Sequence, residues 1–242
     1  MKPSKRPSKD EFLLKERNKI ESEVFDKQTL TILAKIIKKG IIKTVDFPIS
    51  TGKEANVFRA TNQEGKFIAV KVYKMETAPF FRKEEYLEGD PRFKKIKGSD
   101  KEVVLAFARK EFKNLQICER AGVHTPKPLY LEKHVLLMSF LGEEGLPYPT
   151  LNVLNILTEQ DAESILEDVR KMYHAGLVHA DLSEYNILRG VVPYLIDLGQ
   201  GVILSHPRAE EFLARDLRNI LRYFEKRGIK REFEEVLKWV KS

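Results

Sequence analysis

Two polar segments in the second half of the chain carry the residue types that phosphoryl transfer needs. Asn186 follows Asp181 with four residues between them, and Asp197 comes eleven residues after that Asn. The reaction requires a carboxylate that orients or deprotonates an attacking hydroxyl, and oxygen ligands that hold Mg²⁺ against the phosphates. Asp181 can supply the first, and Asn186 and Asp197 the second. The apolar residues 187–188 and 191–196 predict a hairpin that brings Asp197 beside Asp181.

A short glycine-containing loop between two expected strands is suited to covering phosphates. It is the stretch Ser-Thr-Gly-Lys-Glu-Ala-Asn-Val at 50–57. Backbone N–H groups of such a loop can close over phosphates, while Ser50, Thr51 and Lys53 add donors and charge. It is not a Walker A loop, because the leading glycine and the following helix are missing. Taken alone, Thr-Gly-Lys is at least as typical of a hairpin turn.

Lys71 is a cation inside the apolar run 69–72. Burying an ammonium costs free energy unless a carboxylate pairs with it. Glu111, on a predicted helix, is the candidate partner, and the pair would hold Lys71 against the α- and β-phosphates. A lysine on the solvent face of an edge strand is an equally good explanation of this run in isolation. The position of Lys71 after the glycine loop favours the buried pair.

The elements that must position these motifs can be predicted from periodicity and from helix ends. Asp26 is expected to cap a helix that stops at Gly40, and Thr158 with Asp161 has the spacing of a capping box. Residues 76–100 are rich in Pro, Gly and Lys and predict a long mobile loop. The expected strands are 56–60, 67–73, 128–131 and 134–140, and the expected later helices are 103–121, 158–175 and two within 208–242.

The order of loop, lysine, helix with Glu, linker and catalytic carboxylates is the order found in protein kinases. More narrowly, residues 50–57, 178–188 and 196–200 closely resemble the RIO family of atypical serine kinases, in its first branch and in an archaeal form. The resemblance covers roughly residues 26–242. It implies an α+β, two-lobed protein-kinase-like fold, trimmed and with extra N-terminal helices. The expected divisions are a flexible tail at 1–10, N-terminal helices at 11–40, an N-lobe at 41–141 and a C-lobe at 142–242.

The resemblance also implies roles for particular residues. Asp181, Asp197 and Lys71 would be catalytic, with Asp181 as the base, and Asn186 with Asp197 would bind Mg²⁺ or Mn²⁺. Asp197 would also be able to accept phosphate transiently. Residues 139–141 would form the hinge whose backbone meets adenine. The residues expected at the ATP site are Ser50, Thr51, Gly52, Lys53, Glu54, Ala55, Val57, Ala69, Lys71, Glu111, Met138, Ser139, Phe140 and Leu141.

The sequence departs from ordinary kinases in several places. No arginine stands between His179 and Asp181, no Ala-Pro-Glu follows Asp197, and only about 45 residues remain after it. These departures fit the RIO pattern and leave open how a protein substrate is held. Ser139 stands where an acidic residue is expected. Ser99 is a candidate autophosphorylation site by analogy, although an ordinary loop serine explains it at least as well.

Composition allows one large domain or two joined lobes. The 242 residues are 42% hydrophobic, enough for a sizeable core. No run approaches the roughly 18 uncharged apolar residues of a membrane span, and the first residues lack the apolar centre of a signal peptide. The single cysteine, Cys118, excludes a disulfide framework and a cysteine-based metal site. We therefore expect a cytoplasmic monomer.

The net charge of +7 suits a partner that carries phosphates, whether nucleotide, phosphoprotein or RNA. Because the 43 basic and 36 acidic side chains are interspersed, an ordinary solvated surface explains the charge slightly better. The resemblance implies an ATP- and Mg²⁺-dependent serine kinase, an ATPase, or both, acting on itself or on another protein in maturation of the small ribosomal subunit, with the precursor particle and its rRNA as partners. The alternatives are an aminoglycoside-type phosphotransferase and a slowly hydrolysing, nucleotide-switched assembly factor.

Overall fold

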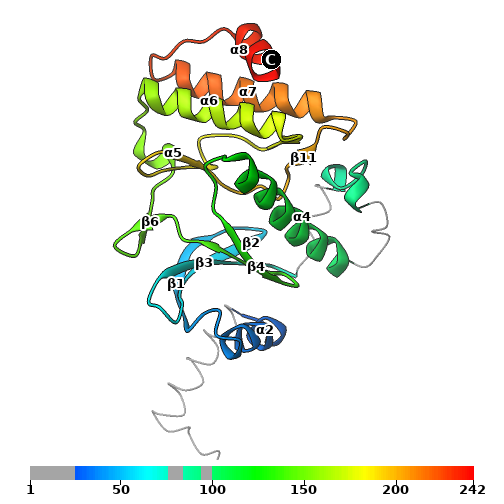
Figure 1. The fold of residues 1–242 in the computed structure, drawn as a ribbon, viewed down its shortest axis with the longest axis vertical. Coiled ribbons are helices and arrows are strands. Elements are labelled where there is room, and N and C mark those ends of the chain that lie inside the picture. The colour runs from blue at the N-terminus through cyan, green and yellow to red at the C-terminus, as the bar shows by residue number, and fades with distance from the viewer. Residues whose placement is uncertain (1–24, 76–83, 94–99) are drawn as a thin grey trace, which may run out of the picture.

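An antiparallel sheet of five strands dominates the first half of the chain, in the order β1-β2-β3-β5-β4 (Figure 1). The computed structural model describes residues 25–75, 84–93 and 100–242. The expected tail, the first expected helix and Ser99 lie outside these residues. The strands are β1 (Thr44–Thr51), β2 (Ala55–Thr61), β3 (Phe67–Tyr73), β4 (Pro128–Glu132) and β5 (Val135–Ser139).

Strand β3 lies in the middle of this sheet, and both of its faces are covered. Ile68 and Val70 belong to one apolar cluster, whereas Ala69 and Tyr73 belong to another. Successive side chains of a strand point to opposite faces, so Lys71 shares the face of Ala69 and Tyr73. The alternative that Lys71 lies on the solvent face of an edge strand is therefore wrong.

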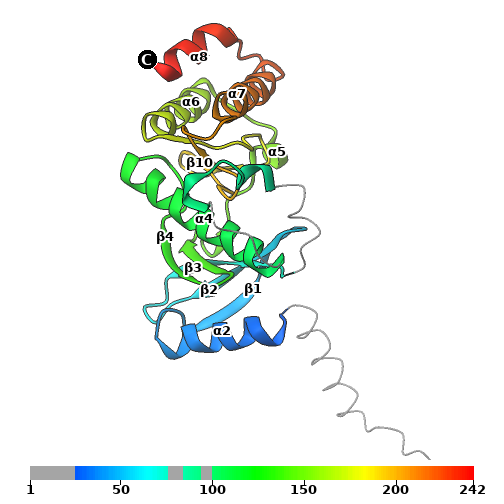
Figure 2. The ribbon, with the colours of Figure 1, turned by 90° about the vertical axis from the view of Figure 1, so that its right-hand side faces the viewer.

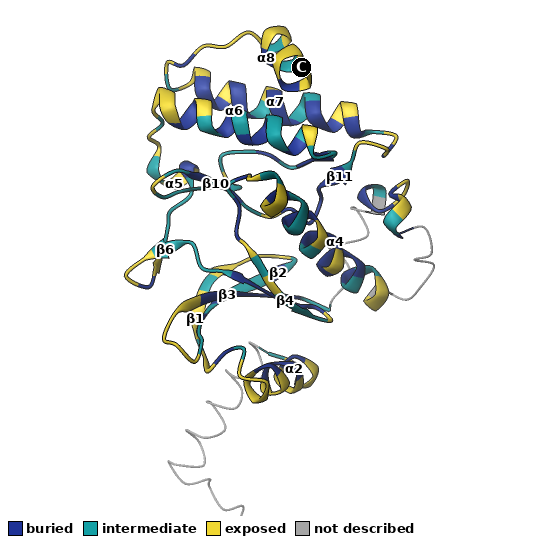
Figure 3. Cartoon of the chain, in the orientation of Figure 1, coloured by how far each residue is buried: buried dark blue, intermediate teal, exposed yellow. Residues whose placement is uncertain are grey.

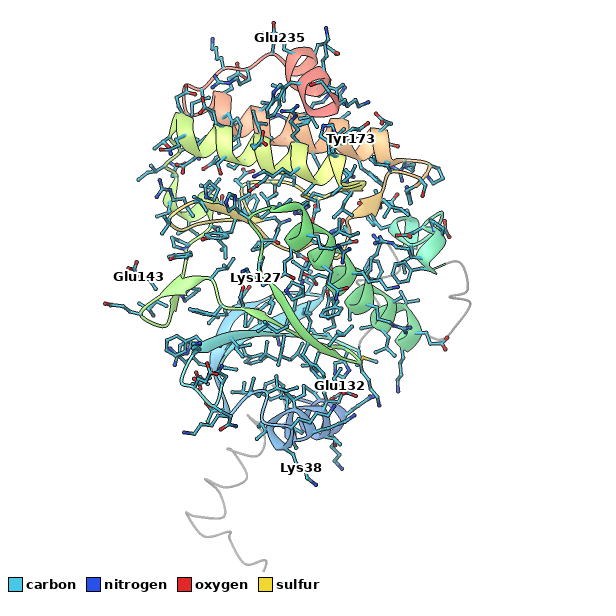
Figure 4. The ribbon with its side chains drawn as sticks, viewed as in Figure 1. Lys38, Lys127, Glu132, Glu143, Tyr173 and Glu235 are labelled. Atoms are coloured by element: carbon cyan, nitrogen blue, oxygen red, sulfur yellow. The ribbon has the colours of Figure 1, made fainter. Side chains whose placement is uncertain are left out.

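Helix α2 (Lys27–Lys38) covers the opposite face of the sheet, as both views show (Figure 2). The predicted cap is confirmed, since the Asp26 carboxylate accepts a hydrogen bond from the N–H of Thr29 at 2.6 Å. The basic Lys38 at the end of the helix points away from the sheet (Figure 4). The helix buries Ile32, Leu33 and Ile36 against the strands.

Helix α4 (Asp100–Ala121) lies between the face of the sheet that carries Lys71 and the helices of the second half (Figures 1 and 2). It starts three residues before the predicted 103–121 and ends at the predicted residue. Gly122 follows with a φ of 68°, the left-handed conformation that commonly ends a helix. Buried positions along α4 form the inner side of the helix (Figure 3).

The second half is mainly helical and contains three short antiparallel strand pairs, β6 with β7, β8 with β11 and β9 with β10. The capping box at Thr158 and Asp161 is present at the start of α6. Helices α6 and α7 lie side by side, and α8 packs at the end of the molecule away from the sheet (Figures 1 and 2). The elements are β6 (Gly142–Glu143), β7 (Leu146–Pro147), α5 (Leu151–Leu154), α6 (Glu159–His174), β8 (Leu177–Val178), β9 (Ile187–Arg189), β10 (Pro193–Leu195), β11 (Val202–Ile203), α7 (Ala209–Glu225) and α8 (Phe233–Lys241).

The described part of the predicted loop 76–100 is irregular but closely packed. Residues 84–93 form two short 3₁₀ turns, Glu84–Tyr86 and Pro91–Phe93. Tyr86 is buried and stacks on Phe212 of α7 with 5.1 Å between ring centroids. The contact between Tyr86 and Phe212 therefore holds the connection between β3 and α4 against the helical half.

These elements confirm the predicted α+β class. The division of the chain into lobes after residue 141 stays a prediction. In the described residues, no helix has both the length and the apolar composition required to cross a bilayer.

The packing of α2 on the sheet predicts unequal effects of two neighbouring substitutions. Ile36 is fully buried and Ile37 is 39% exposed. Ile36→Ala should lower the free energy of unfolding by about 2–5 kcal/mol, because it leaves a cavity against the sheet. Ile37→Ala makes the same chemical change and should cost less than about 1 kcal/mol. Urea unfolding of both variants measures the difference, and equal losses would contradict this packing of α2.

Candidate active site

The Lys71 ammonium joins three separate elements of the fold. Its Nζ lies 2.8 Å from Oε1 and 2.7 Å from Oε2 of Glu111, which α4 carries. It also lies 2.9 Å from Oδ1 of Asp197, which follows β10. The predicted pair of Lys71 and Glu111 is therefore present, and Asp197 is a second carboxylate partner of the same ammonium.

The electrostatics of this cluster keep Lys71 charged. Burial alone disfavours the ammonium, but the charges of Asp197 and Glu111 outweigh it and hold the pKa of Lys71 above its usual value. Burial raises the pKa of Glu111 to about 7, although Lys71 acts in the opposite direction. The Asp197 side chain remains 47% exposed and faces the cavity. The cluster thus has a buried end at Glu111 and an open end at Asp197.

Tyr73 adds a contact that the sequence did not reveal. Its hydroxyl donates a hydrogen bond to Oε2 of Glu111, and the Lys71 ammonium lies 5.2 Å from the centroid of its ring. Tyr73 comes two residues after Lys71 on β3, so both side chains lie on the same face. That period-two spacing is the signal from which Tyr73 could have been proposed.

The loop of Asp181 is organised by side chain to backbone hydrogen bonds. Asn186 Nδ2 donates to the Asp181 carbonyl at 2.8 Å and lies 3.3 Å from Asp181 Oδ2. The backbone N–H of Ile196 donates to the carbonyl of Asn186 at 3.0 Å. As predicted, the β9–β10 hairpin joins this loop to the residue before Asp197.

Ala180 and Asp197 both adopt a φ of 63°, which non-glycine residues rarely do. Such a conformation costs of order 1 kcal/mol or more and persists where the surroundings enforce it. The Asp216 carboxylate of α7 accepts hydrogen bonds from the N–H groups of Ala180 at 2.7 Å and Leu182 at 3.0 Å. The Arg215 guanidinium donates to the carbonyl of Ala180. Adjacent residues of α7 therefore fix the backbone on both sides of Asp181.

Two buried side chains, His179 and Asp216, complete the support of the Asp181 loop. His179 Nε2 donates to the carbonyl of Ile196 at 3.0 Å, which ties the loop to the residue before Asp197. Burial raises the pKa of Asp216 to about 6, although His179 and the two accepted N–H groups act against this rise. Sequence reasoning missed Asp216 and Arg215, although Asp216 falls on the apolar stripe of α7, four residues after Phe212, and this spacing is the signal that could have found it.

A cavity of about 550 Å³ opens beside this cluster. Its wall includes the metal-ligand candidates Asn186 and Asp197, and most of the predicted ATP-site residues. Those are Ser50, Gly52, Lys53, Glu54, Ala55, Val57, Ala69, Lys71, Glu111, Met138, Ser139 and Leu141.

Thr51, Phe140 and Asp181 do not line this cavity. Thr51 is an exposed residue that pairs with Asn56 across β1 and β2. Phe140 packs against Phe67 with 5.7 Å between ring centroids. Asp181 contacts Asn186, which does line the cavity.

The cavity also has walls that the sequence did not single out. The segment that follows the predicted lobe boundary at residue 141 contributes several of them. These residues are Ile49, Tyr73, Leu115, Pro126, Pro147, Tyr148, Pro149, Thr150, Val153, Tyr185, Leu188 and Ile196.

Two backbone groups of the predicted hinge already have partners within the protein. The N–H of Ser139 donates to the carbonyl of Lys127 at 2.8 Å, and the carbonyl of Leu141 accepts from the N–H of Tyr148 at 3.1 Å. An adenine contact at this strand would therefore use other groups, of which the Leu141 N–H and the Ser139 carbonyl are the candidates. The Ser139 hydroxyl accepts from the N–H of Lys127 at 2.9 Å, a contact that stabilises the hinge.

The donor set fits a divalent cation that a triphosphate brings with it. Among the described residues, no group of three or more His, Cys, Asp or Glu side chains could hold a metal alone. Mg²⁺ commonly takes one or two protein carboxylates and completes its octahedron with phosphate oxygens and water. Asp197 offers a carboxylate to the cavity, and Asn186 offers an amide oxygen because its Nδ2 is bound to Asp181.

Comparison with known proteins identifies the family. A model of the RIO domain matches residues 56–236. The RIO-type serine/threonine-protein kinase Rio1 of Haloferax volcanii is 42% identical over 238 residues, which cover 96% of this chain and 82% of that protein. The chain belongs to the RIO family. The Thermoplasma acidophilum Rio1 is 41% identical, with 77% of this chain and 99% of that protein covered. The predicted family, its Rio1 branch and the enzyme class of these named kinases are confirmed.

Other RIO relatives are longer, and solved RIO structures share the fold. Human RIO1, named a serine/threonine-protein kinase, is 38% identical across 86% of this chain, which spans 38% of the human protein. The Rio2 kinase of Chaetomium thermophilum in an ADP/Mg²⁺-phosphoaspartate complex superposes with a TM-score of 0.63 at 22% identity, covering 87% of this chain and 65% of that one. A second Rio2 structure gives a TM-score of 0.65 at 20% identity, covering 85% and 66%. The predicted two-lobed kinase-like fold is confirmed.

The support of the catalytic loop by α7 can be measured. Asp216→Ala leaves the buried N–H groups of Ala180 and Leu182 without acceptors, at about 1–3 kcal/mol each. We expect the free energy of unfolding in urea to fall by about 2–6 kcal/mol. The matched control Glu225→Ala removes an exposed carboxylate from the same helix and should change stability by less than about 0.5 kcal/mol. A loss no larger for Asp216→Ala than for the control would refute this role of the carboxylate.

Proposed function

We propose that this RIO family member is a cytoplasmic, ATP- and Mg²⁺-dependent enzyme that transfers the γ-phosphate to serine of a protein, itself included, and that hydrolyses ATP when water replaces the serine. The observation that carries the proposal is the Lys71 ammonium held by Glu111 and Asp197 at the cavity, with the Asp181 loop next to it. Because the Lys71 ammonium is already buried and charged, it can bind phosphate oxygens without a further free-energy cost for its own desolvation.

In the proposed reaction, each side chain has one task. Lys71 holds the α- and β-phosphate oxygens, while Glu111 keeps the ammonium in place. Asp197 and Asn186 are the ligands for Mg²⁺, which when bound neutralises charge on the transferring phosphate. The glycine loop around Gly52 covers the phosphates with backbone N–H groups. The remaining predicted cavity residues surround the rest of the nucleotide.

Asp181 is the proposed base. The acceptor hydroxyl oxygen forms its bond to the γ-phosphorus as the bond from that phosphorus to the β–γ bridging oxygen breaks. The hydroxyl proton passes to the Asp181 carboxylate, and ADP leaves. Positioning and charge supply most of the acceleration in such reactions, so the fixed backbone around Asp181 is as important as its basicity.

ATP hydrolysis through a phosphorylated enzyme is a second candidate, favoured by one comparison. The Rio2 structure that shares this fold is described as a phosphoaspartate complex. Asp197 is our candidate for the corresponding acceptor, because its carboxylate faces the cavity beside Lys71. A nucleotide-switched assembly factor with slow turnover would use the same residues. A role in maturation of the small ribosomal subunit is proposed from the family, and the net charge of +7 is compatible with an RNA-containing particle.

Incubation with γ-labelled ATP and Mg²⁺ tests the proposal. The protein should be assayed alone, with small ribosomal subunits and with an aminoglycoside, and labelled protein should be separated from free phosphate. Asp181→Ala should lower the turnover rate by about 10²–10⁴-fold and leave ATP binding within a few fold. Asp197→Ala should weaken Mg²⁺-dependent nucleotide binding as well.

Glu163→Ala, which removes an exposed carboxylate from α6, is the matched control and should behave as the wild type. Label on protein supports the kinase, and free phosphate released with little stable label supports the ATPase. Wild-type rates from Asp181→Ala would refute its assignment as the base. Transfer to the aminoglycoside alone would refute a protein substrate.

A further inference from the structure

The side chain of Gln200 touches the proposed base. Its Nε2 donates a hydrogen bond to Asp181 Oδ2 at 2.8 Å. Gln200 is buried and lies three residues after Asp197, in the segment 196–200 that resembles the RIO family. The side chain therefore links the segment of the metal-ligand candidate directly to the carboxylate of the base.

The backbone around Gln200 is fixed by α4. The buried Lys110 donates from Nζ to the carbonyl of Gln200 at 2.9 Å and also to the carbonyl of Gly201. Asn114, one turn later, donates from Nδ2 to the carbonyls of Leu198 and Gly201, each at 2.8 Å. Carbonyl groups on both sides of Gln200 are thus held by buried side chains of the helix that carries Glu111.

Arg92 and Asp90 fix the orientation of the Asn114 side-chain amide. Arg92 Nη1 donates to Asn114 Oδ1 at 2.8 Å, which directs the Asn114 Nδ2 toward the carbonyls. Arg92 is held in turn by the fully buried Asp90, at 2.7 Å between Nη2 and Oδ2. A β-carbon added at Gly201 would lie 2.9 Å from Asn114 Nδ2, so only glycine permits this close approach. The Gln200 backbone has little freedom to move.

These contacts determine where the Asp181 carboxylate points. Asp181 Oδ2 accepts from Gln200 Nε2 at 2.8 Å and lies 3.3 Å from Asn186 Nδ2. A hydrogen bond to an ionised carboxylate is stronger than one between neutral groups and fixes its plane. A base that must meet a hydroxyl in one geometry loses rate when its carboxylate can rotate.

We propose that Gln200, held at its backbone by Lys110 and Asn114, is a positioning residue that orients the Asp181 carboxylate toward the attacking hydroxyl. The inference deepens the proposed function and rests on it. Gln200 acts through Asp181 and has no contact with the nucleotide in this account. Its loss should therefore slow turnover and leave nucleotide binding intact.

The test is Gln200→Met, which keeps the length of the side chain and removes the N–H donor. We expect the turnover rate to fall about tenfold, with the KM for ATP and the thermal midpoint nearly unchanged. Gln28→Met makes the same change at an exposed position on α2 and should behave as the wild type. Gln200→Glu keeps the shape but sets a second carboxylate against Asp181, and its rate should fall at least as far. It also tests the inference should Gln200→Met fail to fold.

A double-substitution cycle separates positioning from general structural support. In an Asp181→Asn background, measured by single-turnover transfer of labelled phosphate, adding Gln200→Met should change the rate less than twofold. An equal tenfold loss in both backgrounds would overturn the inference, as would wild-type turnover in a folded Gln200 variant. A rise in the KM for ATP without a loss of turnover would overturn it too. Absence of transfer from the wild type would instead refute the proposed function, so the two failures are distinguishable.

Discussion

The rest of the site depends on one shared charge, the Lys71 ammonium between Glu111 and Asp197. Placing this cation on the inner face of β3 would be unfavourable without both carboxylates, and Glu111 on its own would be an unpaired buried acid. The sheet, α4 and the segment after β10 meet at this ammonium. Their meeting leaves a positive group and a carboxylate facing a cavity.

A second requirement is that the backbone beside these groups adopts conformations that it would otherwise avoid. Ala180 and Asp197 are both left-handed, and the contacts that enforce this come from elsewhere in the fold. Asp216 and Arg215 of α7 hold the first, and His179 ties the loop to the residue before the second. Hydrogen bonds of this kind between buried groups make a site rigid. The helical half thus acts as the rigid support of the catalytic loop.

Much of the fold and of the site could be predicted from the sequence, because the signals for these parts lie close together along the chain. Asp26 and the Thr158 capping box depend on residues within one turn, and the spacing from Asp181 to Asn186 lies on one loop. Lys71 was ambiguous because its strand becomes central only when β5 pairs with β3, a fact of tertiary structure. The partners of Asp216 and Gln200 could not be predicted from local sequence, since they are 36 and 19 residues away. Thr51 and Phe140 lie in segments that line the cavity, but Thr51 is exposed and Phe140 packs against Phe67.

The arrangement of Lys71, Asp197 and Asn186 around a nucleotide can be seen in a crystal structure with Mn²⁺ and an ATP analogue whose β–γ bridge cannot be cleaved, with the metal located by anomalous scattering. We expect one carboxylate oxygen of Asp197 and the amide oxygen of Asn186 at about 2.1 Å from the metal. Lys71 should contact phosphate oxygens while keeping its bond to Glu111. A metal bound away from Asp197, or a Lys71 side chain turned out of the cavity, would refute this arrangement.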